Sequence, residues 1–84
     1  MIYTVIIERS AKKQLDKIPP PFFDAIDKKI LALETNPRPN GCKKLKDRDG
    51  WRIRVADYRI IYKIKDDILR IIVINVDHRK QVYR

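Results

Sequence analysis

Apolar and basic residues alternate with period two over residues 51–55, and the alternation resumes over residues 58–65. Successive side chains of a β-strand point to opposite faces of a sheet, so this pattern predicts two strands. Ala56 and Asp57, which separate the strands, are predicted to form a two-residue turn. The sequence therefore predicts an antiparallel hairpin that has one apolar face and one basic face.

This pairing sorts the side chains of the hairpin onto its two faces. The apolar face carries Trp51, Ile53, Val55, Tyr58, Ile60 and Tyr62. The basic face carries Arg52, Arg54, Arg59, Ile61 and Lys63. In this register Arg54 lies directly opposite Arg59, and Val55 lies directly opposite Tyr58. Like charges that face each other across a sheet destabilise it, so a patch with three guanidinium groups indicates an anionic partner.

Helical spacing dominates the first half of the chain, after a β-branched segment at residues 2–7 that predicts a strand. Residues 8–18 form the first predicted helix, with Ser10 as a candidate N-cap, and the prolines at 19–21 end it. The apolar stripes consist of Ala11, Leu15 and Ile18 in this helix and of Phe22, Ile26, Ile30 and Leu33 in the next. The second helix ends at Asn36, because a residue before proline is pushed out of the helical region.

The rest of the chain is predicted to complete a sheet. Residues 43–46 predict a short basic strand, and residues 68–76, after a turn at 66–67, predict a strand that is apolar on both faces and therefore central. Residues 77–84 are predicted to form a polar, basic tail. The order β-α-α-β-β-β-β predicts a small single domain of the α+β class over residues 1–84. In this fold an antiparallel pair of helices packs on one face of an antiparallel-rich β-sheet.

Composition narrows the choice of partner. Lys and Arg number 20 against 11 Asp and Glu in a chain of 84 residues, which gives a formal net charge of +9. Such an excess favours nucleic acid or another anionic partner. A single cysteine, Cys42, excludes an internal disulfide and a cysteine-based zinc cluster, and no apolar run is long enough for a membrane span. We therefore expect a cytoplasmic protein that uses no metal and no cofactor.

The basic face of the hairpin is the candidate site for chemistry. Arg52, Arg54 and Arg59 lie on it, and the tail that carries Arg79 and Tyr83 could fold beside the same patch. Guanidinium groups bind phosphate oxygens bidentately and stabilise the charge of a pentacoordinate transition state. Nearby positive charges favour a phenolate over a phenol, so Tyr83 is a candidate general base.

A plain solvated face is the ordinary explanation for basic residues that alternate along a strand. The arginines of this chain pair across the hairpin, and the net charge agrees with an anion-binding role. Ile61, Ile72 and Ile74 would also share the basic face and give the patch a partly apolar floor. From the residues alone, a phosphate-binding function is better supported than a nuclease.

The chain resembles toxins of the RelE/ParE superfamily of bacterial and archaeal toxin–antitoxin systems. The resemblance covers nearly the whole length, through residues 3–7, 11–15, 36–39, 43–45, 51–55, 57–62 and 78–84. It implies a compact α+β toxin in which two helices pack on an antiparallel sheet. It also implies a cognate antitoxin as a binding partner.

RelE-type members enter the ribosomal A site and cut mRNA there, through attack of a ribose 2′-OH on the neighbouring phosphate. The resemblance therefore implies an endoribonuclease whose catalytic positions are Arg52, Arg54, Arg59, Arg79 and Tyr83. It implies mRNA and the RNA of the ribosome as partners. The residues expected to contact RNA are Lys43, Lys44, Lys46, Arg52 and Arg54.

The paired basic positions of RelE-type members can be lysine, whereas this chain has arginine at both, as Arg52 and Arg54. Arginine keeps its proton, so these side chains are assigned to phosphate binding and to the transition state, and Tyr83 is the leading base. The general acid is left unassigned. Two other functions stay open: a ParE-type toxin that poisons DNA gyrase, and a nucleic-acid-binding member without catalysis.

Overall fold

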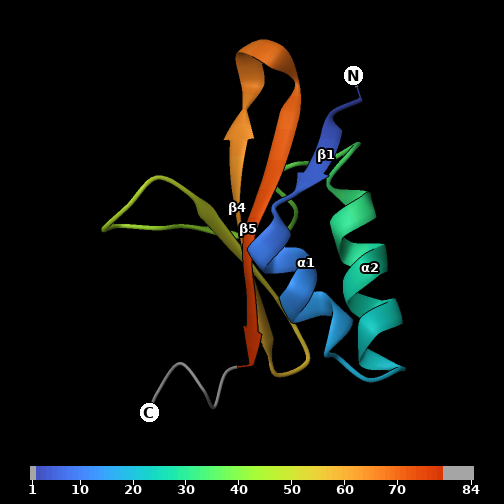
Figure 1. Ribbon diagram of the computed structural model, residues 1–84. Coiled ribbons are helices and arrows are strands. Elements are labelled where there is room, and N and C mark those ends of the chain that lie inside the picture. Colours follow the sequence, from blue (N-terminus) through green and yellow to red (C-terminus); the bar gives the residue numbers. More distant parts are fainter. Residues whose placement is uncertain (1, 79–84) are drawn as a thin grey trace.

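The computed structural model describes residues 2–78, so Arg79 and Tyr83 lie outside the described part of the chain. Figure 1 shows the elements, which are β1 (Thr4–Ile7), α1 (Arg9–Asp16), α2 (Phe22–Ala32), β2 (Lys43–Lys44), β3 (Trp51–Val55), β4 (Tyr58–Lys65), the 3₁₀ turn η1 (Asp66–Ile68) and β5 (Arg70–His78). The five strands form one sheet in the order β1-β5-β4-β3-β2. All neighbours are antiparallel except β1 and β5, so the expected α+β fold with an antiparallel-rich sheet is confirmed.

The two helices run in opposite directions and cover one face of the sheet (Figure 1). The buried side chains of the helices are Ala11, Leu15, Ile26 and Ile30, and those of the residues that follow them are Ile18 and Leu33. The sheet packs against them with Ile53, Ile60, Tyr62, Ile71, Val73 and Val76. Trp51, Val55 and Tyr58 pack against this core, which confirms the apolar face expected for the hairpin. Within residues 2–78 no helix is long and apolar enough to cross a membrane.

The start of α1 differs from the expected one. Ser10 lies inside the first turn of the helix and is not its N-cap; that position belongs to Glu8, whose side chain makes no capping hydrogen bond. The backbone N–H of Glu8 donates to the carbonyl of Val73 at 3.0 Å, which keeps Glu8 extended in line with β1. The helix therefore begins directly after the last residue that the sheet holds.

The connection from β4 to β5 is longer than the expected two-residue turn. It consists of η1 followed by Leu69, which adopts a left-handed conformation with φ 51°, and β5 begins at Arg70 rather than at residue 68. At its other end β5 extends to His78, so residues 77 and 78 belong to the sheet and not to the tail. The strand is an inner one, between β1 and β4.

A bulge interrupts the pairing of β4 with β5. The partner of Tyr62 is Val73 and the partner of Ile61 is Asn75, so the register passes over Ile74. Ile74, which was expected on the basic face, sits instead at the bulge. An extra residue of this kind inverts the alternation of the strand beyond it. The bulge therefore decides which residues at the end of β5 join the basic face.

A polar cluster ties the loop after α2 to the far end of the sheet. The hydroxyl of Tyr3 donates to Asp66 at 2.6 Å, and the Nη2 of Arg38 lies 2.8 Å from the same carboxylate. The hydrogen bonds from Arg38 and then from Tyr3 hold the pKa of Asp66 below its usual range, and the bond to Asp66 raises the pKa of Tyr3. The Arg38 guanidinium also lies over the ring of Trp51, 5.1 Å from its centroid.

Candidate functional site

The expected register of the hairpin is confirmed. Arg54 lies opposite Arg59, and Arg52 lies opposite Ile61 on β4 and opposite Lys43 on β2. Residues that pair across antiparallel strands share a face, and their neighbours Ile53 and Ile60 point into the core. The basic side chains therefore gather on the sheet face that points away from the helices. We call this surface the outer face.

The arginines of the outer face differ in how far they are buried. Arg54 is exposed, whereas Arg52 and Arg59 are half-buried and their Nε atoms are fully buried. Ile61 is only 1% exposed, although it belongs to the face without helices. A guanidinium whose stem is packed in this way loses less rotational freedom when it binds an anion than a fully exposed one.

The loop from Leu45 to Gly50 packs over the outer face. The Leu45 N–H donates to the carbonyl of Gly50 at 3.0 Å, which closes the loop. Gly50 has φ +148°, and a Cβ atom built there would lie 3.3 Å from Leu45 Cδ1 and 3.7 Å from Ile61 Cγ2. Leu45 and Ile61 thus flank the same small space, which gives the arginines an apolar floor. In Figure 1 this loop extends from the sheet on the side away from the helices.

An acidic residue that was expected in the tail joins the arginines. The register pairs Asp77 with Arg59, and Asp77 Oδ1 lies 3.8 Å from the Nε of Arg59. Both atoms are buried, and neither has a hydrogen-bond partner within residues 2–78. The other carboxylate oxygen of Asp77 accepts a short hydrogen bond from the side-chain amide of Asn75.

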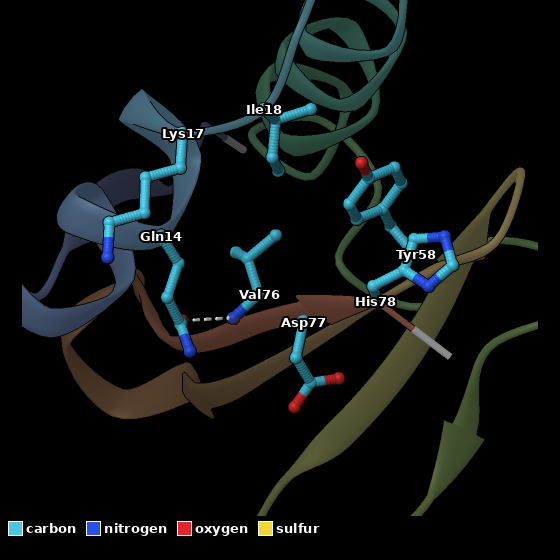
Figure 2. A pocket seen from close by; sticks show the side chains of 7 residues that line it. All are labelled: Gln14, Lys17, Ile18, Tyr58, Val76, Asp77 and His78. Atoms are coloured by element: carbon cyan, nitrogen blue, oxygen red, sulfur yellow. Dashed lines mark hydrogen bonds between the residues drawn. The ribbon is translucent and has the colours of Figure 1, made fainter. Parts of the chain in front are cut away.

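A cavity of about 320 Å³ opens beside this acidic residue, at the end of β5. Its lining, shown in Figure 2, consists of Gln14, Lys17, Ile18, Tyr58, Val76, Asp77 and His78. The rings of Tyr58 and His78 meet edge to face with centroids 5.0 Å apart. The cavity therefore lies at the end of the described part of β5, and it shares with the outer face the residue that pairs with Arg59, Asp77.

The structure brings together four of the sequence-predicted site residues: Lys43, Arg52, Arg54 and Arg59 share the outer face. Lys44 pairs with Trp51 and therefore points to the helix side of the sheet, and Lys46 is an exposed loop residue. Arg79 and Tyr83 lie outside the described residues. Among residues 2–78, no three His, Cys, Asp or Glu side chains are grouped as a metal ion would require.

Sequence reasoning missed Gln14, Asn75 and Asp77. A signal for the last two was present in the order of apolar and polar residues, because strict alternation from Ile71 and Val73 would bury the polar Asn75 and expose Val76. Burial of Val76 instead, as observed, leaves a gap of three after Val73. A gap of three between buried positions of one strand indicates a bulge, which would have moved Asn75 and Asp77 to the basic face. Nothing in the sequence marks Gln14, because its partners are remote in the chain.

Known proteins are similar to this chain in sequence and in fold. The family model of the ParE toxin of type II toxin–antitoxin systems, parDE, matches residues 5–83. Toxin RelG of Mycobacterium tuberculosis is 30% identical over 86 residues, which cover 100% of this chain and 99% of RelG.

Two solved structures have the same fold. The crystal structure of the toxin–antitoxin complex RelBE2 from Mycobacterium tuberculosis matches with a TM-score of 0.83 at 28% identity, over 94% of this chain and 100% of that one. The archaeal RelE–RelB complex from Pyrococcus horikoshii matches with a TM-score of 0.84 at 27% identity, over 94% and 97% of the two chains.

Proposed function

The chain belongs to the RelE/ParE superfamily of toxins from type II toxin–antitoxin systems, and we propose that it cleaves mRNA in the ribosomal A site. The observation that carries this proposal is the cluster of Arg52, Arg54 and Arg59 on the outer face, in which Arg52 and Arg59 are half-buried residues. The net charge of +9 supports a large polyanionic target. A ribosomal target in turn implies that the chain acts in the cytoplasm.

In the proposed reaction the ribose 2′-oxygen attacks the neighbouring phosphorus, and the bond from phosphorus to the 5′-oxygen of the next nucleotide breaks. The products are a 2′,3′-cyclic phosphate and a 5′-OH. The proton of the 2′-OH passes to a general base, for which we propose Tyr83, and an acid that is not assigned supplies a proton to the 5′-oxygen. Arg52, Arg54, Arg59 and Arg79 would stabilise the added negative charge of the pentacoordinate phosphorus.

Primer extension on mRNA translated by purified ribosomes tests this proposal. The wild-type protein should produce cuts in the A-site codon, and Arg59→Ala combined with Tyr83→Phe should reduce them by at least about 100-fold, the scale of a lost transition-state contact. Lys12→Ala removes an exposed cation from α1, on the other side of the molecule, and should cleave as the wild type does. Absence of cleavage by the wild type, or full cleavage by the double variant, would contradict the proposal.

A cognate antitoxin is the second proposed partner. The matched RelBE2 and RelE–RelB structures are complexes of a toxin with its antitoxin, which supports the same assembly for this chain. We expect acidic residues of the antitoxin to approach the outer face, where Arg54 is exposed. Binding should therefore weaken at high salt and in Arg54→Ala. An affinity that is insensitive to both would exclude this electrostatic contact.

Poisoning of DNA gyrase is the alternative, because the matching family model is that of ParE toxins. It predicts trapped gyrase–DNA complexes in an assay with gyrase and DNA, and intact mRNA in the primer-extension assay. A non-catalytic nucleic-acid-binding protein would also leave mRNA intact, but it would trap no gyrase–DNA complexes, and its binding to RNA would fall steeply with salt.

A further inference from the structure

Four side chains from three parts of the sequence, α1, β5 and β4, form a continuous polar chain that ends at Arg59. Gln14 of α1 accepts a hydrogen bond from the backbone N–H of Val76 at 2.6 Å and donates one to Asn75 Oδ1 at 2.8 Å. Asn75 then donates to Asp77, and Asp77 faces the Nε of Arg59 at 3.8 Å. Figure 2 shows Gln14 and Asp77 along one side of the cavity, with the Gln14–Val76 bond dashed.

The polar chain begins at Gln14, beside a part of β5 where the edge of the sheet is open. β1 pairs with β5 only as far as Val73, so the backbone of β5 beyond that residue has no strand beside it on this edge within residues 2–78. Because α1 follows β1 directly, Gln14 stands next to this edge and takes the place of a strand as the acceptor for Val76. A single side chain thus satisfies a backbone donor that would otherwise be left without a partner.

The backbone N–H of Val76 also fixes the direction of every bond that follows. An N–H can only donate, so the oxygen of Gln14 must face it and the amide nitrogen must face Asn75. Asn75 accepts with its oxygen and therefore presents its nitrogen to Asp77. One oxygen of Asp77 is held in this way, and the other is left toward Arg59. The orientation of the carboxylate is determined from outside the arginine cluster.

We propose that Asp77, held by Asn75 and Gln14, is a positioning residue that fixes the guanidinium of Arg59 for contact with the scissile phosphate. This inference rests on the proposed ribonuclease function and deepens it. The contact lies at the Nε edge of the guanidinium, which leaves the terminal nitrogens of Arg59 as donors to phosphate oxygens. The carboxylate also offsets the repulsion between Arg59 and Arg54, which face each other across the hairpin.

Asp77→Asn separates positioning from a general effect of charge. The amide has the size of the carboxylate and can still accept from Asn75, but it loses the charge that faces Arg59. We expect the cleavage rate at saturating ribosomes to fall by roughly 10- to 100-fold, as for a misplaced catalytic group, while the ribosome concentration for half-maximal rate changes less than about two-fold. Asp57→Asn is the matched control, because it removes the same charge from the exposed turn of the arginine hairpin and should leave the rate unchanged.

Gln14→Glu tests the polar chain at the end that is farthest from Arg59. Glutamate can still accept from Val76, but it cannot donate to Asn75, so the amide of Asn75 turns its nitrogen away from Asp77. We expect the cleavage rate to fall, as it does for Asp77→Asn. Equal rates for the wild type, Asp77→Asn and Gln14→Glu would overturn the proposal.

Hydrogen exchange of the arginine Nε–H groups, followed by nuclear magnetic resonance in the protein without ribosomes, gives a readout that does not depend on cleavage. The buried Nε–H of Arg59 should exchange more slowly than that of the exposed Arg54, and Asp77→Asn should abolish the difference. If Asp77→Asn abolishes this protection but the wild type cuts no mRNA, the ribonuclease proposal fails and the positioning of Arg59 by Asp77 stands. If Asp77→Asn leaves the exchange of Arg59 unchanged, the positioning proposal fails, whatever the activity.

Discussion

Arg54 and Arg59 occupy directly opposed positions on β3 and β4, on the face of the sheet that the helices leave uncovered. Two cations in this arrangement repel each other, and the ion pair of Arg59 with Asp77 offsets the repulsion on one side only. Arg54 is exposed, so its charge is compensated mainly by solvent and salt. The hairpin therefore holds a repulsive pair that a bound anion would relieve.

Replacement of Arg54 should stabilise the free protein while it impairs function. We expect Arg54→Gln to raise the free energy of unfolding by about 0.2 to 1 kcal/mol at low salt, since it removes one member of an opposed like-charged pair. The gain should shrink at high salt, where the charges are screened. Thermal unfolding at two salt concentrations measures this, with Lys12→Gln on α1 as the control for the same change in net charge. A destabilised Arg54→Gln at low salt would show that the opposed arginines are not a source of strain.

The hairpin could be predicted from the sequence because its information is local. Two alternating strands joined by Ala56 and Asp57 leave only one register that keeps both faces consistent, and that register is the observed one. The apolar stripes of the helices could also be predicted from local spacing, and in the structure they pack on the apolar face of the hairpin. The limits of α1 could not be predicted in the same way, because the bond from Glu8 to Val73 joins residues that are far apart in the chain.

The candidate site could be predicted only in part. Arg52, Arg54 and Arg59 followed from period two, but the position of Asp77 depends on a bulge and on a longer turn before β5. Each of these changes the register, and the bulge inverts the face as well. Gln14 reaches the site only because α1 stands beside an open edge, which is a property of the assembled sheet.

Tyr62 anchors the loop after α2 from within the core. Its ring is fully buried, and its hydroxyl donates to the carbonyl of Pro37 at 2.8 Å. Tyr62→Phe should therefore lower the free energy of unfolding by about 0.5 to 1.5 kcal/mol at neutral pH, the net contribution of one such hydrogen bond. Urea unfolding measures the loss. Tyr58→Phe, which removes a hydroxyl from a half-buried ring, is the control and should cost less.

The same residue predicts a decline of stability in alkali. Burial raises the pKa of the Tyr62 hydroxyl far above its ordinary value. Above a pH of about 10 the unfolded chain releases this proton while the folded protein keeps it, so unfolding becomes more favourable as the pH rises. Tyr62→Phe should lose stability less steeply than the wild type over that range. Parallel slopes for the two proteins would contradict the expected retention of the proton.

The lowered pKa of Asp66 predicts that stability is lost at low pH, whereas Tyr62 predicts a loss at high pH. The hydrogen bonds from Arg38 and then Tyr3 lower its pKa, so the carboxylate contributes stability that is present above its unfolded pKa of about 4 and is lost as the pH falls through the folded value. Asp66→Asn should therefore be less stable than the wild type at neutral pH, and the difference should vanish in acid. Asp67→Asn, at the neighbouring exposed position, is the control in the same unfolding series. A difference that persists at low pH would assign the effect to something other than the charge.

The outer face also predicts how RNA binding depends on salt. Each cation that contacts a phosphate of single-stranded RNA adds about 0.7 to the slope of log affinity against log salt, so Lys43→Gln combined with Arg54→Gln should reduce the slope by about 1.4. Both side chains are exposed on the outer face, and neither is needed for the core. Lys12→Gln with Lys28→Gln removes two exposed cations from the helices and should keep the wild-type slope. Fluorescence anisotropy over a salt series measures both. A similar loss of slope in the two double variants would mean that RNA senses only the net charge of the protein, and that the arrangement of cations on the sheet does not define its binding surface.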